Sequence, residues 1–245
     1  SADGKNLFYD GSDPAHLSVL AYNFIAGQLR HAKAFSAVVA PSVNSYKRLV
    51  PGYEAPVYIG WAEVNRSALI RIPRVNHGNN NGVRIELRCP DPSANPYLAF
   101  NAMLAAGLDG IDQGLSCPKP LNNINVYELN AAEREELGIE MLPGSLKEAL
   151  DEFQKDEILQ AAFGKPLTEK FIDSRLAEWE AYRIHVSDWE VSRYLETLWS
   201  SLMRVLKKSR TLKMNIFIFK KITICLYTAL QTPPLWFPSP ASRFS

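Results

Sequence analysis

The spacing of hydrophobic residues predicts an amphipathic helix near the start of the chain. Asp13 and Pro14 are typical of an N-cap and the first residue of a helix. Apolar residues then recur every three or four positions as far as about Ala37, which is the period of one helix face. The next segment, 44–56, is rich in turn-forming residues and has a Pro-Gly dipeptide at its centre, so we predict a loop there.

Three segments after this loop have the patterns of short strands. Residues 57–64 are rich in aromatic and branched side chains, whereas 68–72 and 83–89 alternate between apolar and polar positions. Alternation with a period of two places the apolar residues of a strand on one side of a sheet. Residues 90–96 contain three prolines and interrupt this pattern, and a helical pattern resumes over 97–108.

The rest of the ordered pattern is helical. Ser145 precedes an apolar pair with the spacing of a capping box, Thr168 is a predicted cap for a later helix, and a last helix is expected to begin near Ser187. Short strands followed by a block of helices predict an α+β fold class, with antiparallel strands packed against helices.

Charge divides the 245-residue chain into an acidic body and a basic tail. The formal net charge is only +1, yet no Asp or Glu occurs after Glu196, and eight Lys and Arg residues do. Such asymmetry indicates parts with different origins. We therefore predict a domain over 1–198 and a basic apolar tail of unknown origin over 199–245, outside that domain. The whole-chain charge therefore says nothing about partners, and we expect no nucleic-acid partner.

The apolar part of the tail, 214–230, does not have the pattern of a membrane span. It is shorter than the ~20 residues needed to cross a bilayer, and Lys220 and Lys221 lie near its middle. We expect no membrane insertion. Three widely spaced cysteines without a CxxC pair suit a reducing compartment, which indicates a cytoplasmic protein.

Arg84, Glu86 and Arg88 are two residues apart, so they share the polar face of a predicted strand. One interpretation is a solvated face with weak ion pairs. The other is a polyanion site, because guanidinium groups bind phosphate and carboxylate, and a carboxylate between them can hold a hard cation. Arg66 and Arg71 on the preceding segment add to the same positive charge, but the sequence contains neither a P-loop nor a GxGxxG motif.

The loop over 44–56 carries Lys47, Arg48 and Glu54 around its Pro-Gly dipeptide. It is either an ordinary surface loop or an active-site lid with a carboxylate and cations near its tip.

Several motifs together resemble one enzyme family. The sequence of 44–56, Asn-Ser-Tyr-Lys-Arg-Leu-Val-Pro-Gly-Tyr-Glu-Ala-Pro, resembles the glutamate-flap signature of type I (bacterial-type) glutamine synthetase. Motifs at 65–68, 70–73, 84–88 and 90–97 follow in the family's order and approximate spacing. The resemblance extends from Gly4 to about Leu195.

This resemblance implies ATP-dependent amidation of L-glutamate with ammonia through γ-glutamyl phosphate, with Mg²⁺ or Mn²⁺ as cofactor. In the family, active sites form between neighbouring subunits of stacked rings, so a homo-oligomer is implied. The implied residue roles are these: Glu54 and Arg66 are catalytic; Arg48, Glu54, Arg66 and Arg88 bind glutamate; Arg66, Arg71 and Arg84 bind ATP; and Glu86 binds metal.

The chain departs from the family at its beginning. The family's N-terminal β-grasp domain, first catalytic strands and metal histidine have no counterpart in 1–198, so we expect a partial catalytic domain that is weakly active or inactive alone. Two alternatives are a non-catalytic fragment that associates with intact subunits, and a γ-glutamyl ligase that uses another amine. The flap sequence favours ammonia.

Two further features of the sequence bear on chemistry. The four histidines match no metal-ligand spacing. Tyr127 lies where some family members carry the tyrosine that is adenylylated, but the surrounding match is loose and a structural tyrosine is the preferred interpretation.

Overall fold

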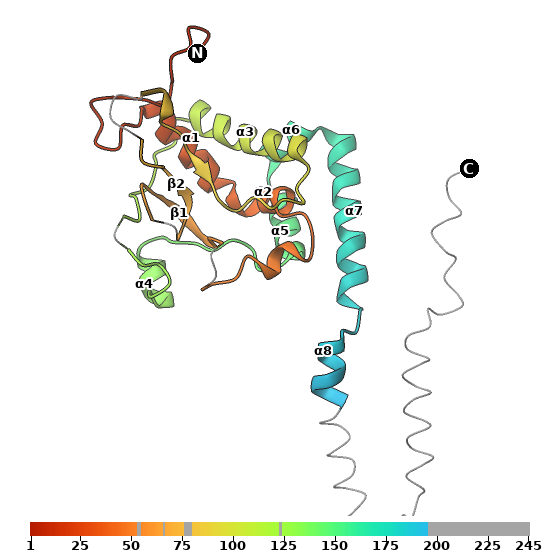
Figure 1. The fold of residues 1–245 in the computed structure, drawn as a ribbon. Helices are drawn as coiled ribbons and strands as arrows, with labels where there is room; N and C mark the ends of the chain where they lie inside the picture. Colours follow the sequence, from red (N-terminus) through yellow and green to blue (C-terminus); the bar gives the residue numbers. More distant parts are fainter. Residues whose placement is uncertain (53–54, 66, 76–79, 123, 196–245) are drawn as a thin grey trace, which may run out of the picture. The chain divides into compact units, whose positions relative to one another are not determined.

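The computed structural model describes residues 1–195 except 53–54, 66, 76–79 and 123 (Figure 1). By its internal contacts the chain divides into two units, 1–185 and 186–245, and the second is described as far as Leu195. The predicted tail over 199–245 therefore lies outside the described residues. Among the described residues, no helix is long and apolar enough to cross a membrane.

The first unit consists of helices around a small sheet. Its described α-helices are α1 (Val19–Arg30), α2 (Ala32–Val39), α3 (Pro96–Asp112), α4 (Ala131–Glu136), α5 (Leu146–Phe153), α6 (Glu157–Phe163) and α7 (Lys165–Arg183). Its strands are β1 (Tyr58–Ala62), β2 (Ala68–Arg71) and β3 (Glu86–Leu87). The mixture of helices and a small sheet confirms the predicted α+β class.

The first predicted helix is two helices, and its predicted start was wrong. The N-cap is Ser18, whose hydroxyl accepts a hydrogen bond from the Ala21 N–H. The Asp13 carboxylate instead accepts from the backbone N–H groups of Ala15 and Leu17, which closes a turn before the helix. The apolar period continues through His31, but there the backbone leaves helical geometry and separates α1 from α2.

Helices α1 and α3 cross at two glycines, and this crossing brings together segments far apart in the sequence. A Cβ on Gly27 would lie 2.1 Å from the Ala106 carbonyl oxygen, and one on Gly110 would lie 2.2 Å from the Asn23 carbonyl oxygen. No side chain fits at either position, so the two backbones can approach this closely only because both residues are glycine. Figure 1 shows the two helices packed side by side.

The sheet has the order β1-β2-β3 and is mixed. β2 and β3 are antiparallel, as predicted, with Arg71 opposite Glu86. β1 and β2 are parallel, with Tyr58 opposite Ala68, so the prediction of an antiparallel sheet was wrong for this pair. Parallel neighbours usually need a crossover of about a dozen residues, so the short connection between these strands concealed their direction.

Helix caps were predicted with mixed success. Ser145 caps α5 and accepts from the Glu148 N–H, as expected. Ser187 likewise caps α8 (Asp188–Glu190), which precedes the π-helical turn η3 (Val191–Leu195) of the second unit. The Thr168 cap was wrong: α7 begins after Gly164, and the Thr168 hydroxyl donates to the Gln160 carbonyl oxygen from inside the helix.

Candidate functional site

Two neighbouring strands bring Arg71 and Glu86 together. They are opposite each other in the β2–β3 register, so both side chains extend from the same face. The Arg71 Nη2 donates a hydrogen bond of 2.6 Å to the Glu86 Oε2. Both side chains are partly open to solvent, with exposed fractions of 28% and 35%.

Arg88 approaches the same carboxylate from the other side. Its backbone N–H donates to the Leu69 carbonyl oxygen at 3.0 Å, which extends the pairing with β2 one residue past β3. Its Nε lies 3.6 Å from the Glu86 Oε1. The predicted sharing of one face by Glu86 and Arg88 is therefore confirmed, and Arg71 joins them.

Arg48 reaches this region from the loop before β1. The turn η1 (Ser45–Lys47) directly precedes Arg48. The Arg48 Nη2 donates hydrogen bonds to the carbonyl oxygens of Cys89 and Pro90, and the bond to Pro90 is 3.2 Å long. We call Arg48, Arg71, Glu86 and Arg88 the arginine edge. This group contains three guanidinium groups and one carboxylate, so it has an excess of positive charge.

Two donors of the arginine edge have no acceptor. In the part of the chain that the structure describes, the Nε atoms of Arg48 and Arg71 are buried and have no hydrogen-bond partner. A buried donor without an acceptor costs about 1–3 kcal/mol. An anion bound by these guanidinium groups would offset part of that cost, which fits the polyanion interpretation better than the solvated face.

The other predicted site residues are Arg84, Glu54 and Arg66, and of these the structure describes Arg84. Arg84 is exposed and its Nη1 donates only to the Gly82 carbonyl oxygen, at 3.1 Å, because β3 begins two residues later. Glu54 and Arg66 lie outside the described residues. Within the predicted lid, 44–56, Leu49 and Ala55 are buried, whereas Gly52 between them is exposed.

The described residues do not by themselves form a metal site. Among them there is no group of three or more His, Cys, Asp or Glu side chains placed to hold a metal ion. Glu86 could contribute one oxygen ligand, but Arg71 and Arg88 already engage its two oxygens. A divalent cation here would need further oxygen ligands from elsewhere.

Tyr127 lies at one end of the same region. Its ring is half-buried and packs edge-on against the Tyr58 ring, with the centroids 5.5 Å apart. Burial raises the pKa of the Tyr127 phenol, and the positive charge of Arg88 opposes that rise. These contacts fit a structural tyrosine, and its modification stays a hypothesis.

Sequence reasoning missed a second ionic cluster, which we call the histidine bridge: His31, Asp109 and Asp156. The His31 Nδ1 lies 2.5 Å from the Asp156 Oδ2, and its Nε2 lies 3.0 Å from the Asp109 Oδ2. The side chains are almost closed to solvent, with exposed fractions of 6%, 6% and 11%. Each residue comes from a different place in the sequence, so no spacing rule could have found the cluster.

The geometry of the histidine bridge favours a protonated imidazole. A neutral ring has one N–H, whereas both ring nitrogens of His31 face carboxylate oxygens. Burial by itself would lower the pKa of His31, but the hydrogen bonds to Asp156 and Asp109 outweigh it, and the pKa is raised. The pKa of Asp109 is lowered, because hydrogen bonds from His31 and Gln113 outweigh the opposing effect of burial.

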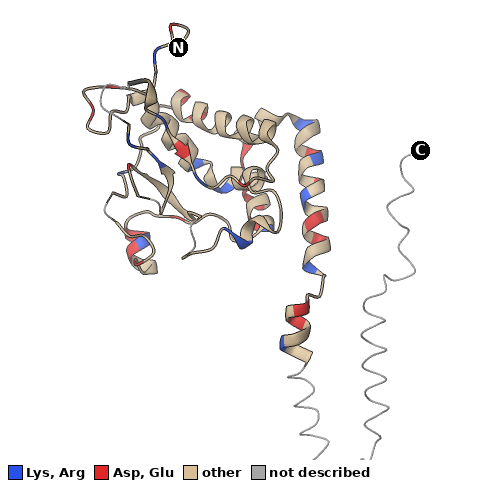
Figure 2. Cartoon of the chain, in the orientation of Figure 1, with Lys and Arg blue, Asp and Glu red and all other residues tan. Residues whose placement is uncertain are grey.

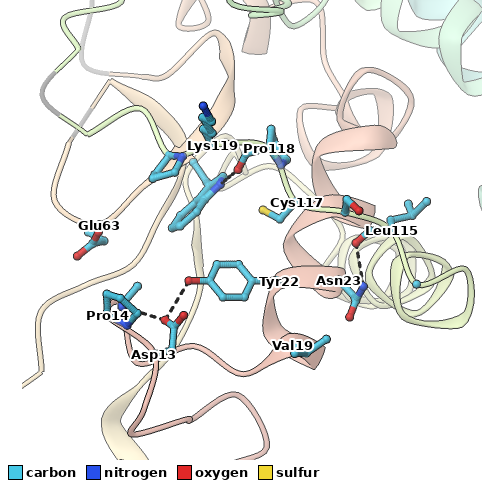
Figure 3. A pocket seen from close by; sticks show the side chains of 15 residues that line it. Asp13, Pro14, Val19, Tyr22, Asn23, Glu63, Leu115, Cys117, Pro118 and Lys119 are labelled. Carbon is cyan, nitrogen blue, oxygen red and sulfur yellow. Dashed lines mark hydrogen bonds between the residues drawn. The ribbon is translucent and has the colours of Figure 1, made fainter.

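A pocket of about 640 Å³ lies between the start of α1 and the loop after α3 (Figure 3). Two of its polar groups have internal partners: the Tyr22 hydroxyl donates to Asp13 at 2.9 Å, and the Trp61 Nε1 donates to the Pro118 carbonyl oxygen at 2.7 Å. Burial raises the pKa of the Cys117 thiol to about 12, so the nucleophilic thiolate is scarce near neutral pH. Cys117 is therefore a poor nucleophile in this pocket.

A mixed sheet whose edge gathers arginines around one carboxylate defines a domain suited to phosphate- and carboxylate-bearing ligands. Residues 1–194 match the family described as "Glutamine synthetase, catalytic domain", and the chain belongs to that family. Enzymes of this family generally use ATP and divalent metal ions.

Relatives named glutamine synthetase occur in bacteria and archaea. The chain is 52% identical over 191 residues to that of Thermotoga maritima, which covers 78% of this chain and 43% of the relative. It is 51% identical over 196 residues to that of Methanosarcina mazei, with 80% and 43% covered. The chain thus spans less than half the length of these relatives.

Solved structures agree with the fold. A structure described as "GmaS/ADP complex-Conformation 1" superposes with a TM-score of 0.69 at 37% identity, over 80% of this chain and 44% of that one. A second, described as "Apo GmaS without ligand", gives a TM-score of 0.65 at 36% identity.

Proposed function

We propose that residues 1–198 form part of a glutamine synthetase catalytic domain that acts in the ATP-dependent amidation of L-glutamate with ammonia. The reaction would pass through γ-glutamyl phosphate, with Mg²⁺ or Mn²⁺ as the divalent cation. The subtype that fits the flap sequence best is type I. The assembly would be a homo-oligomer of stacked rings in the cytoplasm, as the resemblance implies.

The arginine edge is the observation that carries this proposal. ATP and glutamate are both anionic, and charge grows on the transferring phosphoryl group during the reaction. Fixed guanidinium groups stabilise such charge without reorganising. The excess of Arg48, Arg71 and Arg88 over Glu86, together with two buried donors that lack acceptors, fits a surface built to receive anions.

Each residue of the site has a proposed role. Arg71 and Arg84 contact the phosphates of ATP, and Arg48 and Arg88 hold the carboxylates of glutamate. Glu86 supplies one ligand to a divalent cation, whose other ligands come from outside the described residues.

The remaining two proposed roles belong to residues that lie outside the described ones, Glu54 and Arg66. Glu54 closes over the site, keeps water from the acyl phosphate and accepts a proton from ammonium. Arg66 bridges the phosphoryl group and the substrate and is the second catalytic residue.

Nucleotide binding by the purified chain tests the proposal directly. We expect ATP to bind, and Arg71→Ala to weaken binding by about tenfold or more, since hydrogen bonds to charged groups contribute about 1.5–3 kcal/mol. Arg183→Ala is the matched control, because this arginine is exposed and, among the described residues, pairs within α7 with Glu180 at 2.5 Å. Equal affinities for the wild type and Arg71→Ala would remove the arginine edge from the proposal.

Activity requires a separate assay. Formation of γ-glutamyl hydroxamate from glutamate, hydroxylamine and ATP would report the complete reaction. We expect little or no product from this chain alone, because the described residues do not complete a metal site. Product at the rate of an intact relative would contradict the expectation of a partial domain.

A second candidate function is favoured by the length of the relatives. This chain covers 42–45% of the curated relatives that it matches most strongly, so a non-catalytic role in association with intact subunits is also consistent. Mixing experiments with an intact synthetase would separate the two: association without any nucleotide binding supports this candidate over the first. A ligase that uses another amine would be recognised by product formation with that amine in place of ammonia.

A further inference from the structure

The pocket between the start of α1 and the loop after α3 has the size of a small-molecule site. Its volume of about 640 Å³ falls within the range of about 300–1,000 Å³ that such sites occupy. We call it the Tyr22 pocket, after one of the residues that line it (Figure 3). It shares no residue with the arginine edge, so a ligand here would be held by a different set of side chains.

Much of the lining of the Tyr22 pocket is apolar and open to solvent. Val19, Leu115 and Pro118 line it, and Val19 is 76% exposed. The Tyr22 ring is half-buried and packs edge-on against the Trp61 ring, with the centroids 5.7 Å apart. Covering such surface with hydrocarbon is favourable. A ligand of this pocket is therefore expected to have an apolar body.

Three side-chain donors of the Tyr22 pocket are already engaged by acceptors in the same pocket (Figure 3). The bonds run from Tyr22 to Asp13 at 2.9 Å, from Asn23 to the Leu115 carbonyl oxygen at 2.8 Å, and from Trp61 to the Pro118 carbonyl oxygen at 2.7 Å. They hold these side chains in place without a ligand. They also use up donors that an anionic ligand would need.

The two carboxylates of the Tyr22 pocket keep room for further donors. Asp13 accepts its hydrogen bonds at Oδ2, and Glu63 accepts one at Oε1 from the Asn122 side chain, at 2.6 Å. Among the residues that the structure describes, the Asp13 Oδ1 and the Glu63 Oε2 accept no hydrogen bond, and neither carboxylate has a basic partner. An ionised carboxylate has about four acceptor sites, so the pocket has acceptors to spare.

The charge of the Tyr22 pocket has the same sign as these spare acceptors. Asp13 and Glu63 outnumber the one basic lining residue, Lys119. Figure 2 shows that α1 and α3 carry little charge, whereas α7 carries many charged residues. Burial raises the pKa of the Tyr22 phenol, and the hydrogen bond to Asp13 and the charge of Glu63 raise it further. The pocket therefore favours a cation.

We propose that the Tyr22 pocket is a binding site for a small organic cation, namely a primary ammonium group joined to an apolar body. The ammonium group has three N–H donors and no acceptor, so it matches the spare oxygens of Glu63 and Asp13. The hydrocarbon lies against Leu115 and Pro118. This inference goes beyond the proposed synthetase function and depends on no residue of the arginine edge.

Calorimetric titration of the full 245-residue chain with phenethylammonium tests the proposal. Phenethyl alcohol has nearly the same shape without the charge, and methylammonium has the charge without the apolar body. We expect phenethylammonium to bind about fivefold or more tightly than either, since each comparison compound lacks one of the two features. Added salt should weaken binding of phenethylammonium but not of the alcohol, because salt screens partly exposed charges.

Two variants of the pocket should change the affinity in opposite directions. Glu63→Gln keeps an oxygen that accepts from Asn122, so the chain should fold, but phenethylammonium should bind about threefold to tenfold more weakly. Lys119→Gln removes an exposed positive charge and should strengthen binding by about twofold. A general loss of stability would not produce this opposite pair of effects.

Glu140→Gln is the matched control, because it neutralises a carboxylate that pairs with Lys33 and does not line the Tyr22 pocket. It should leave the affinity for phenethylammonium unchanged. Arg71→Ala, which should weaken binding of ATP, should also leave it unchanged. The two binding sites can therefore be tested separately on one set of proteins.

Three results would overturn the proposal. One is no heat of binding with the wild type. Another is binding of phenethyl alcohol as tight as that of phenethylammonium, since the pocket would then be only an apolar surface. The third is an unchanged affinity in Glu63→Gln, which would show that the cation binds elsewhere. None of these results bears on binding of ATP at the arginine edge, so the proposed synthetase function would stand or fall separately.

Discussion

The arginine edge and the histidine bridge are both ionic clusters, but they differ in balance and enclosure. In the histidine bridge, one imidazolium faces two carboxylates, and Arg30 lies 3.7 Å from Asp109, so charges and hydrogen bonds are matched within the fold. The arginine edge has three guanidinium groups and one carboxylate, and that carboxylate pairs with Arg71 and Arg88. Two of its donors lack acceptors among the described residues, and its side chains remain partly exposed.

This difference separates a structural cluster from a binding surface. A buried cluster whose charges and hydrogen bonds are balanced has no unpaired group to bind a ligand. It stabilises the packing of the segments that carry it. An open cluster with excess charge is completed only by an anion. Changes to the first should therefore alter folding stability, whereas changes to the second should mainly alter ligand affinity.

Removing the centre of the histidine bridge should have the largest effect. His31→Leu removes the imidazolium that faces both Asp109 and Asp156, and breaking a buried ion pair from one side costs about 3–5 kcal/mol. Urea unfolding measures this loss. His185→Leu is the control, because His185 is exposed and should change stability by less than about 0.5 kcal/mol. Similar midpoints for the two variants would show that the bridge is not structural.

The stability supplied by the histidine bridge should also depend on pH. Because the folded-state pKa of His31 is raised, its contribution is complete below its ordinary value and falls as pH rises through the folded-state pKa. Because the pKa of Asp109 is lowered, its contribution is complete above its ordinary value and is lost on acidification. The difference in unfolding free energy between wild type and His31→Leu should be larger at about pH 5.5 than at about pH 9. A difference that grows with pH would contradict a protonated bridge.

Arg48 contributes both to folding stability and to the binding surface. Its removal should therefore lower the unfolding free energy by less than the removal of His31. Arg48→Ala removes hydrogen bonds to the Cys89 and Pro90 carbonyl oxygens and should lower unfolding free energy by about 1–2 kcal/mol. Lys47→Ala, at the exposed neighbouring cation, should have little effect in the same urea experiment. If both variants unfolded like the wild type, Arg48 would belong wholly to the binding surface.

Glu86→Gln distinguishes internal pairing from ligand binding at the arginine edge. Neutralising Glu86 frees Arg71 and Arg88 from their carboxylate, so ATP affinity without divalent cations should rise about threefold to tenfold, consistent with a surface ion pair of about 1 kcal/mol. Calorimetric titration measures this change. Glu140→Gln, which alters a carboxylate paired with Lys33 elsewhere, should leave the affinity unchanged. Weaker binding by Glu86→Gln would mean that the carboxylate organises the arginines instead of competing with phosphate.

The smallest effect is expected at Arg84. This side chain is exposed and has one hydrogen bond to a nearby carbonyl oxygen, so Arg84→Ala should change unfolding free energy by less than about 0.5 kcal/mol. ATP affinity should nevertheless fall by a few-fold if Arg84 contacts phosphate. Chemical denaturation and ligand titration on one preparation give both quantities, and unchanged ATP affinity would exclude Arg84 from the site.

The sequence predicted much of the local structure because local rules govern it. Apolar spacing identified the helical and strand segments, and the hydroxyl caps at Ser145 and Ser187 were found from spacing alone. The alternation around Glu86 correctly placed it on one face with Arg88, since side chains in a strand have a period of two. The break at His31 was missed because the apolar period continues through it.

By itself, then, the sequence determined the family, the α+β class and the residue types of the arginine edge, all of which depend on short motifs. Only the tertiary structure decided the parallel pairing of β1 with β2, the partners of Arg48 and the existence of the histidine bridge. It also decided which face of α3 is left in solvent, because the glycine crossing with α1 fixes the rotation of that helix. These features join residues far apart along the chain, and such contacts depend on how the elements pack rather than on any local pattern.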